Sequence, residues 1–209
     1  MNIETLCLGE YQTNAYILSL ESGECVVIDP ADNGEMIARC IVDKGLFPVA
    51  ILLTHGHYDH ILGIPGLQKK WPDLPIYCHS DDCPEEKVEY DMGKQYPTVS
   101  AFSPLRHYGE GDVVAVGNIN IDVMHTPGHT KGSVMLNAGN ALFTGDTLFA
   151  GSAGRTDLPG GNEKDLMKSL RRFAELDKNL IIYPGHGPAS TVNRELSRNL
   201  YIRYALMGR

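Results

Sequence analysis

The chain has 209 residues, which is enough for one sizeable domain and too few for two of typical size. Its 26 acidic residues exceed its 18 basic residues, giving a formal charge of −8, and Lys and Arg form no run. This balance argues against a nucleic-acid partner, because a protein that grips a phosphate backbone needs a positive surface.

Targeting and membrane signals are missing from the sequence. No stretch reaches the roughly 20 apolar residues that a membrane helix needs, and residues 1–10 lack the basic start and apolar run of a signal peptide. The five cysteines are odd in number and scattered, which predicts no disulfide framework. Cys78 and Cys83 have the spacing of a metal-binding pair, but no second pair follows. We therefore expect a cytoplasmic protein that does not contact a membrane.

Short strands and helices alternate along the first half. We expect strands over 15–20 and 24–28, a helix over 33–44, a strand over 49–53, a helix over 61–71 and a strand over 75–78. Residues 82–106 carry mixed charge, tyrosines and prolines without periodicity. They predict a long surface excursion.

The second half repeats this alternation. We expect strands over 112–124, 133–137 and 141–144, a helix over 163–176, a strand over 180–183 and a closing helix over 191–205. The halves are comparable and no low-complexity linker separates them. The pattern predicts a single α/β domain over residues 1–209 that contains two sheets.

Four potential metal ligands follow directly on the apolar strand 49–53: His55, His57, Asp59 and His60. In extended backbone His55 and His57 project to the same side, so both can reach one ion. Asp59 and His60 lie beyond the turn, where they can face a second position. The alternative is a cluster of surface histidines. It is disfavoured because desolvating four polar side chains beside a buried strand costs several kcal/mol unless a metal or hydrogen bonds satisfy them.

Three more polar residues stand just after predicted strands: His129, Asp146 and His186. Each is preceded by a glycine, which permits the sharp turn that aims a side chain into a shared cleft. One such residue alone would be read as structural. Three in the same context as the histidine cluster predict a joint metal site.

Together with the run 26–30, which ends in Asp29 and a proline, these motifs resemble the five ordered motifs of the metallo-β-lactamase superfamily. The resemblance spans residues 29–186. It implies that family's α/β fold, an αββα sandwich of two mixed sheets flanked by helices. It also implies two divalent metal ions, with zinc as the first expectation and iron or manganese as alternatives, because His and carboxylate ligands suit all three.

The resemblance gives each member of the set a role. One metal would be held by His55, His57 and His129, the other by Asp59, His60 and His186, with Asp146 bridging both. Asp29 would hydrogen-bond to groups around the ligands. His125 is a second candidate for such a supporting role, with strand-end packing as the alternative.

The segment 144–157 is similar to the corresponding segment of the glyoxalase II branch. True β-lactamases of this fold often lack the Asp59–His60 continuation or have a Cys at the position of Asp146. Arg155 matches a lysine that contacts glutathione in glyoxalase II, whereas Asp157 replaces its tyrosine. Only 23 residues follow His186, so we expect no C-terminal helical glutathione-binding domain. The resemblance is therefore to the short, glyoxalase II-like bacterial hydrolases.

This branch implies a thioesterase that cleaves S-lactoylglutathione or a related acyl thioester with a hydroxide that bridges two metals. Asp59 would orient this nucleophile and accept its proton. Arg155 would bind a carboxylate of a small anionic substrate, with a solvated surface arginine as the alternative. The acyl group and the oligomeric state stay open.

Other functions of the same fold are also open. A mononuclear-iron persulfide dioxygenase shares the run 154–157 and the early histidine cluster. A lactonase would need an apolar acyl pocket, and the acid surplus disfavours a ribonuclease. A non-catalytic metal-binding protein is disfavoured by the complete ligand set.

Overall fold

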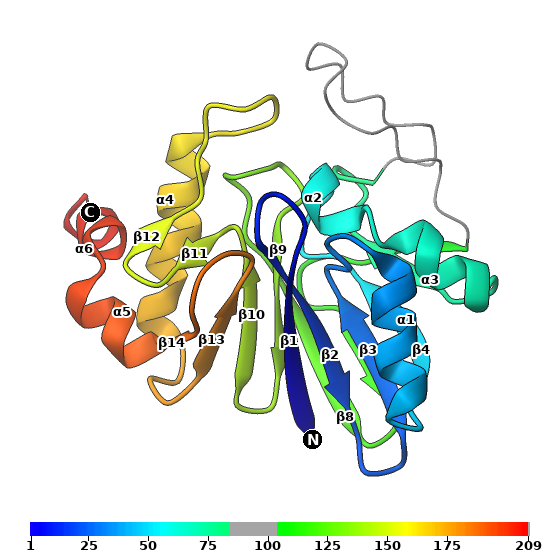
Figure 1. The fold of residues 1–209 in the computed structure, drawn as a ribbon. Coiled ribbons are helices and arrows are strands. Elements are labelled where there is room, and N and C mark those ends of the chain that lie inside the picture. Colours follow the sequence, from blue (N-terminus) through cyan, green and yellow to red (C-terminus); the bar gives the residue numbers. More distant parts are fainter. Residues whose placement is uncertain (84–103, 209) are drawn as a thin grey trace. The chain divides into compact units, whose positions relative to one another are not determined.

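The computed structural model describes residues 1–83 and 104–208. The chain divides into two compact units, one made of residues 1–108 with 116–118 and the other of 109–115 with 119–209. Each unit is organised around a six-stranded sheet (Figure 1). Most of the predicted excursion over 82–106 lies outside the described residues. No helix in the described part of the chain is long and apolar enough to cross a membrane.

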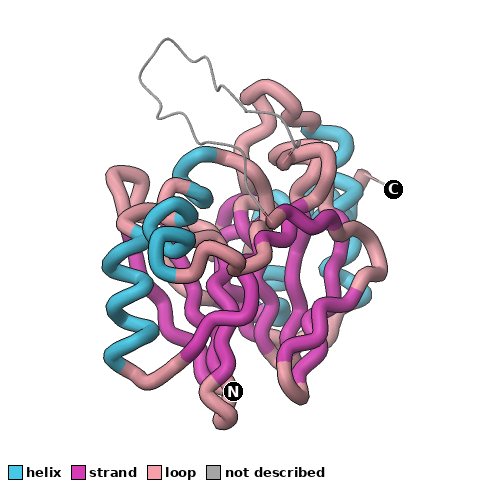
Figure 2. The backbone as a smooth tube through the Cα atoms, turned by 90° about the vertical axis from the view of Figure 1, so that its right-hand side faces the viewer, coloured by secondary structure: helices cyan, strands magenta, loops and turns pink. Residues whose placement is uncertain are grey.

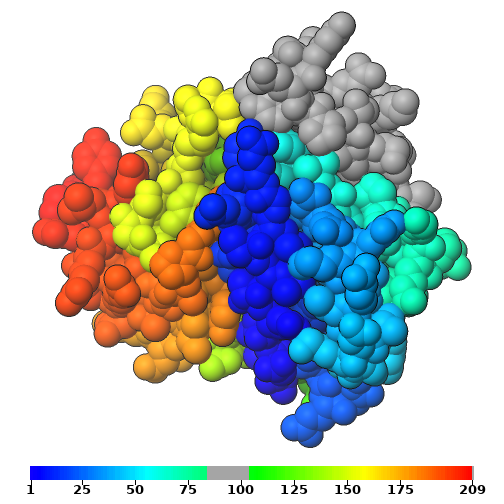
Figure 3. Space-filling model, viewed as in Figure 1, coloured from blue at the N-terminus to red at the C-terminus, as the bar shows by residue number. Residues whose placement is uncertain are grey.

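The sheet of the first unit is mixed. In order across the sheet its strands are β1 (Asn2–Leu8), β2 (Thr13–Ser19), β3 (Glu24–Ile28), β4 (Phe47–Leu52), β5 (Ile76–Cys78) and β6 (Leu105–His107). The pairs from β1 to β3 are antiparallel, and those from β3 to β6 are parallel. The carboxyl ends of β3, β4 and β5 therefore meet at one edge of this sheet. No strand was predicted over the residues of β1, a partly exposed edge strand that is seen in dark blue in Figure 3.

Helices of the first unit are α1 (Gly34–Asp43), α2 (Tyr58–Ile61) and α3 (Ile64–Lys70). The side chain of Asn33 begins α1 by accepting a hydrogen bond from the Met36 amide. The single helix predicted over 61–71 is in fact broken between α2 and α3. The amide of Gly63 leaves the helical pattern and donates to the Pro30 carbonyl at 2.8 Å. That contact holds the segment after β3 against the segment after β4.

The sheet of the second unit is also mixed. Figure 2 draws the strands of the molecule in magenta and its helices in cyan. In order across the sheet its strands are β14 (Ser190–Thr191), β13 (Ile181–Pro184), β10 (Ala141–Gly145), β9 (Val134–Ala138), β8 (Ile119–His125) and β7 (Val113–Val116). β10 is parallel to β13, and β9 is antiparallel to both β8 and β10. The carboxyl ends of β8, β10 and β13 therefore lie at the same edge. The single strand predicted over 112–124 is two strands, because Gly117 turns the chain with φ 54°.

Helices of the second unit pack over one hydrophobic core. They are α4 (Glu163–Arg171), the 3₁₀ turn η1 (Arg172–Glu175), α5 (Val192–Arg198) and α6 (Leu200–Met207). The core joins Leu142 and Ile182 of the sheet to Leu170 and Phe173 beneath the helices. A small two-stranded ribbon, β11 (Leu148–Phe149) with β12 (Ser152–Ala153), follows β10. The helix predicted over 191–205 is two helices, because Asn199 ends α5 and caps α6.

Cys78 and Cys83 form a disulfide, contrary to the prediction of no disulfide. β5 ends at Cys78, and the chain then turns so that the two Cα atoms lie 5.9 Å apart. The spacing in sequence did not reveal this, because five residues can follow many backbone paths. Cys7, Cys25 and Cys40 are free, and burial raises the pKa of Cys25 to about 12. The cysteines therefore no longer support the expectation of a reducing compartment.

Candidate metal centre

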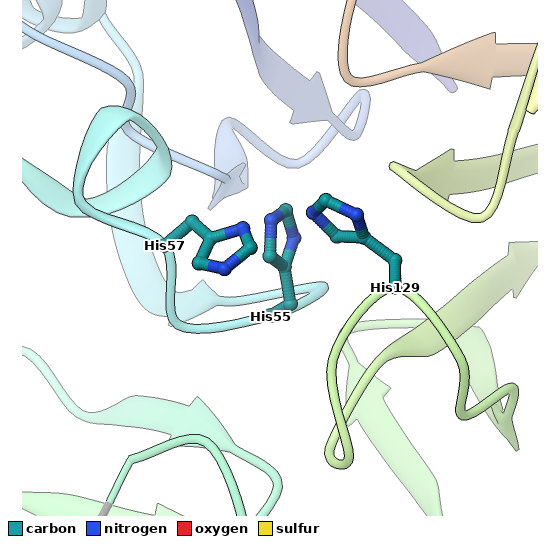
Figure 4. A group of neighbouring side chains, drawn as sticks. All are labelled: His55, His57 and His129. Atoms are coloured by element: carbon teal, nitrogen blue, oxygen red, sulfur yellow. The ribbon is translucent and has the colours of Figure 1, made fainter. Parts of the chain in front are cut away.

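The loop after β4 presents two histidines. The ring centroids of His55 and His57 lie 4.8 Å apart, with the planes nearly perpendicular. Figure 4 shows both imidazoles on the same side of this loop, as the alternation of extended backbone predicts. His55 is buried and His57 is half-buried. The figure also draws His129, which belongs to the second unit.

A relay of hydrogen bonds orients His55. Asp29 follows β3, and its carboxylate accepts from the Thr54 amide at 2.7 Å and from the Thr54 hydroxyl at 2.6 Å. Because the Thr54 proton is directed to Asp29, the Thr54 oxygen accepts from Nδ1 of His55, 3.1 Å away. The relay places the proton of a neutral His55 on Nδ1 and the lone pair on Nε2. An imidazole binds a metal through such a lone pair.

Asp29 also holds His60. Nδ1 of the fully buried His60 donates to the Asp29 carboxylate at 3.0 Å. Nε2 of the same ring lies 3.6 Å from Oδ2 of Asp59. One ligand atom from each of Asp29, His55 and His60 falls within 4.8 Å of the others. Since the Asp29 carboxylate accepts three hydrogen bonds, its arrangement is that of a residue that orients ligands.

Asp59 lies in the first turn of α2, and its side chain is partly exposed. Its Oδ2 accepts a hydrogen bond of 2.8 Å from the hydroxyl of Thr13 at the start of β2. It lines a cavity of about 200 Å³ together with Tyr11 and Tyr58, whose rings meet edge to face at 5.4 Å. The carboxylate is therefore both fixed in orientation and open to a small molecule.

In the second unit Asp146 lies between two histidines. Its Oδ2 is 3.5 Å from Nε2 of His129 and 3.5 Å from Nε2 of His186. Nδ1 of His129 donates to the backbone carbonyl of Arg155 at 2.8 Å, so this ring also carries its proton on Nδ1. A carboxylate oxygen shared by two imidazoles is the arrangement expected of a bridging ligand.

Two glycines allow close contacts between backbone segments next to the candidate ligands His129 and Asp146. Gly128, just before His129, has φ 145°, and a Cβ there would lie 2.3 Å from the Leu166 backbone. A Cβ on Gly154 would lie 1.9 Å from the carbonyl oxygen of Asp146. The sequence identified the first glycine through its place before a candidate ligand. The second belongs to the run 154–157 that carries the family resemblance, but its close approach to Asp146 was not predicted.

His125 supports the loop that carries His129. Its Nε2 donates to the carbonyl of Lys131 at 2.8 Å and so closes that loop. Its backbone amide donates to Glu110, and its carbonyl accepts from Arg172. Arg172 also bonds Glu110 directly and lowers the pKa of that carboxyl.

The guanidinium of Arg155 is exposed and pairs with Asp157. Nε and Nη2 of Arg155 each donate to one Asp157 oxygen at 2.7 Å. This pair lowers the pKa of Asp157 to about 2. Arg155 therefore contributes two groups: a carbonyl that orients His129 and a cation next to it on the surface. Arg155 and Asp157 also line a groove of about 570 Å³ between the 153–157 segment, α4 and α6.

Several residues of the site were missed in sequence. Thr54 stands inside the histidine motif and could have been proposed from its place there. Thr13 and Asp82 act over long sequence separations, through hydrogen bonds to Asp59 and to the Gly56 amide, and nothing in the local pattern indicates them.

The donor set fits divalent metal ions. Imidazole nitrogens and carboxylate oxygens are ligands for zinc, iron and manganese. Three of the imidazoles have Nδ1 committed to another group, which directs Nε2 to a ligand. The fold and these clusters define a metal-binding α/β protein with its ligands at strand ends.

A model of the metallo-beta-lactamase superfamily matches residues 8–186, and the chain belongs to this superfamily. The predicted fold class, two mixed sheets with flanking helices, is thereby confirmed.

Two curated relatives cover nearly the whole chain. The "Probable metallo-hydrolase YqgX" of Bacillus subtilis is 35% identical over 202 residues, covering 93% of this chain and 94% of the relative. The hydroxyacylglutathione hydrolase GloC of Haemophilus influenzae is 30% identical over 213 residues, covering 97% and 98%.

Two solved structures are similar over most of their length. The B3 metallo-beta-lactamase BLEG-1 superimposes with a TM-score of 0.87 at 32% identity, covering 96% of this chain and 99% of that one. TTHA1623 in a di-iron-bound form gives a TM-score of 0.83 at 36% identity, with coverage of 95% and 99%.

Proposed function

We propose that the protein is a metal-dependent hydrolase that cleaves small, anionic acyl thioesters of the S-lactoylglutathione type. The observation that carries this proposal is the donor set, in which Asp146 lies 3.5 Å from two imidazoles and three rings are anchored through Nδ1. The relative GloC, a hydroxyacylglutathione hydrolase, supports the substrate class.

Two divalent ions complete the proposal. One would be held by His55, His57 and His129, the other by Asp59, His60 and His186, with Asp146 shared. Bound there, the ions supply Lewis acidity, which brings the pKa of a water nucleophile near neutrality and polarises the thioester carbonyl. The di-iron-bound relative supports two ions and leaves zinc, iron and manganese as candidates.

The chain's own residues would then position the nucleophile and bind the substrate. Asp59, steadied by Thr13 and open to the 200 Å³ cavity, would orient the nucleophile and accept its proton. Arg155 would attract a substrate carboxylate into the groove that it lines. The groove also offers Leu166 and Tyr204, which suit the apolar part of a thioester.

β-Lactam hydrolysis is the second candidate, because the B3 metallo-beta-lactamase is 32% identical to this chain. The two candidates predict different products from the same centre. Thioester cleavage releases a free thiol, whereas β-lactam opening does not.

The test is hydrolysis by the Asp146→Ala variant. The wild-type protein, loaded with zinc, manganese or iron, should release thiol from S-lactoylglutathione. Asp146→Ala should lose at least about 100-fold in kcat/KM, because one carboxylate serves both ions. Its bound metal per chain should fall in parallel.

Asp122→Ala is the matched control, since Asp122 is an exposed aspartate on β8 of the same unit. It should keep full activity and metal content. The same protein is then assayed for hydrolysis of a cephalosporin and of a lactone. Oxygen consumption with a persulfide is measured with an oxygen electrode. Oxygen consumption with one iron per chain would instead indicate a persulfide dioxygenase. A fully metallated chain that cleaves none of these substrates would contradict the proposal.

A further inference from the structure

We propose that Asp82, held by the Cys78–Cys83 disulfide, is a positioning residue for His55 and His57, and that opening this disulfide weakens metal binding. The inference rests on the proposed metal site. It does not depend on which substrate that site hydrolyses.

Asp82 touches the peptide between the two histidines. The amide of Gly56 donates to Oδ2 of Asp82 at 3.1 Å. The backbone is equally close, because a Cβ added to Gly56 would lie 2.3 Å from the Asp82 carbonyl oxygen. Any residue other than glycine at position 56 would force the backbone to shift. The direction in which the loop presents His55 and His57 therefore depends on where Asp82 lies.

The position of Asp82 depends in turn on a short closed turn. The amides of Asp82 and Cys83 both donate to the carbonyl of His79, at 3.0 and 3.1 Å. Cys83 is bonded to Cys78, the last residue of the parallel strand β5. The turn is thus linked covalently to the sheet whose neighbouring strand, β4, leads to the histidine loop. A cross-link of this kind restricts the conformations that the turn can adopt.

A dithiol opens this link by exchange. One thiolate of the dithiol attacks a cysteine sulfur, and the second then closes on the first, releasing the protein. Two electrons and two protons pass to the protein, so that Cys78 and Cys83 become thiols and the dithiol becomes a cyclic disulfide. The turn is then held by its hydrogen bonds alone, and the contact between Asp82 and Gly56 opens more often.

Hydrogen exchange of the Gly56 amide in the metal-free protein is the first test. Oxidised protein should show three free thiols when unfolded, and protein treated with dithiothreitol should show five. Reduction should lower the protection of the Gly56 amide at least about tenfold. The Gly151 amide, which donates to Glu195 in the second unit, is the internal control and should not change. Equal protection of Gly56 in both states would overturn the inference.

Metal affinity provides the second test, with Mn²⁺ as the probe because thiolates bind it poorly. Asp82→Ala should weaken Mn²⁺ binding by about 10-fold or more, the usual effect of losing a group that orients ligands. Asp82→Asn keeps an acceptor oxygen and should restore most of the affinity. The double variant Cys78→Ser/Cys83→Ser should resemble Asp82→Ala, whereas Cys40→Ser, which removes a free cysteine, should bind as wild type.

Each outcome of the two tests is decisive. Asp82→Ala with unchanged Mn²⁺ affinity would refute the positioning role. If the double variant does not fold, reduced wild-type protein represents the same open state, and the Gly56 amide decides. If the protein behaves as expected in both tests but cleaves no thioester, the proposed function is contradicted and the inference about Asp82 is not.

Discussion

The candidate ligands are oriented by groups that would not touch a metal themselves. Thr54 holds Nδ1 of His55, Asp29 holds Nδ1 of His60, and a backbone carbonyl holds Nδ1 of His129. Each contact selects the tautomer with its lone pair on Nε2. Affinity for metal should therefore respond to changes at these supporting residues.

Thr54→Val is the cleanest such change, because it replaces the hydroxyl of a fully buried side chain with a methyl group of similar size. The relay from Asp29 to His55 would then be broken while the volume stays similar. We expect metal affinity, measured by calorimetry with Zn²⁺, to fall by about 10- to 100-fold. Thr54→Ser restores the hydroxyl and should recover binding. Wild-type affinity in Thr54→Val would show that the relay does not orient His55.

Arg155 can be tested through its partner. Asp157 is paired with the Arg155 guanidinium, which lowers the pKa of this carboxyl to about 2, and so it competes with any substrate carboxylate for that guanidinium. Arg155→Ala should raise KM for S-lactoylglutathione about 10-fold with little change in kcat. Asp157→Asn should lower KM, since the guanidinium is released.

An uncharged thioester is the control substrate, and neither variant should change its KM. Arg194→Ala, an exposed arginine on α5, should behave as wild type with both substrates. An unchanged KM in Arg155→Ala would show that Arg155 is a solvated surface arginine that does not bind the substrate.

At the scale of elements, parallel strands explain why scattered motifs form clusters. Asp29 and His55 follow β3 and β4, which are parallel neighbours, and Asp146 and His186 follow β10 and β13, which are parallel neighbours too. Carboxyl ends of such strands meet at one edge. The hydrophobic pattern predicted most of these strands, and their parallel pairing explains why the candidate ligands that follow them lie close together.

Breaks between elements were harder to predict from the sequence. The helix predicted over 61–71 is interrupted at Gly63, whose amide donates to the carbonyl of the distant Pro30. The helix predicted over 191–205 is divided at Asn199, whose side chain accepts from the Tyr201 and Ile202 amides and so begins a new helix. The disulfide spans only five residues, but it depends on the path of the turn after β5. The contacts of Gly63, Thr13 and Asp82 join residues that are far apart in the sequence. Local patterns carry no information on such partners, because they depend on how the sheet brings segments together.

Glu195 links three elements of the second unit and gives a prediction about stability. This buried carboxylate accepts from the Gly151 amide at 2.8 Å, from the Asn199 side chain at 2.9 Å and from the Ser190 hydroxyl. Glu195→Ala would leave these donors unsatisfied and should lower the free energy of unfolding by about 2–3 kcal/mol in urea titrations. Glu175→Ala, at an exposed glutamate of η1, should change it by less than about 0.5 kcal/mol.

At the scale of the whole molecule, each of the two compact units carries some of the candidate ligands. His55, His57 and His60 belong to the first, and His129 and His186 belong to the second. Under the proposed ligation, a bound metal stabilises both units, since ions that bind only the folded state shift the unfolding equilibrium.

Metal removal tests this directly. Adding Mn²⁺ to chelator-treated protein should raise the Tm and should slow hydrogen exchange in the segments 54–60, 145–147 and 185–187 together. At a concentration 100 times Kd the gain is about 2.7 kcal/mol. Slower exchange in one unit only would contradict ligation by both.

Asp29 occupies a backbone conformation that few residues with side chains adopt. Its φ of 47° lies in the left-handed region, at a cost of about 1–2 kcal/mol. Asp29→Gly would relieve that strain but would leave the Thr54 amide, the Thr54 hydroxyl and the His60 ring without their acceptor. Each buried donor that loses its acceptor costs about 1–3 kcal/mol, which together exceeds the strain relieved. Selection for heat tolerance and selection for turnover should therefore both keep aspartate at this position.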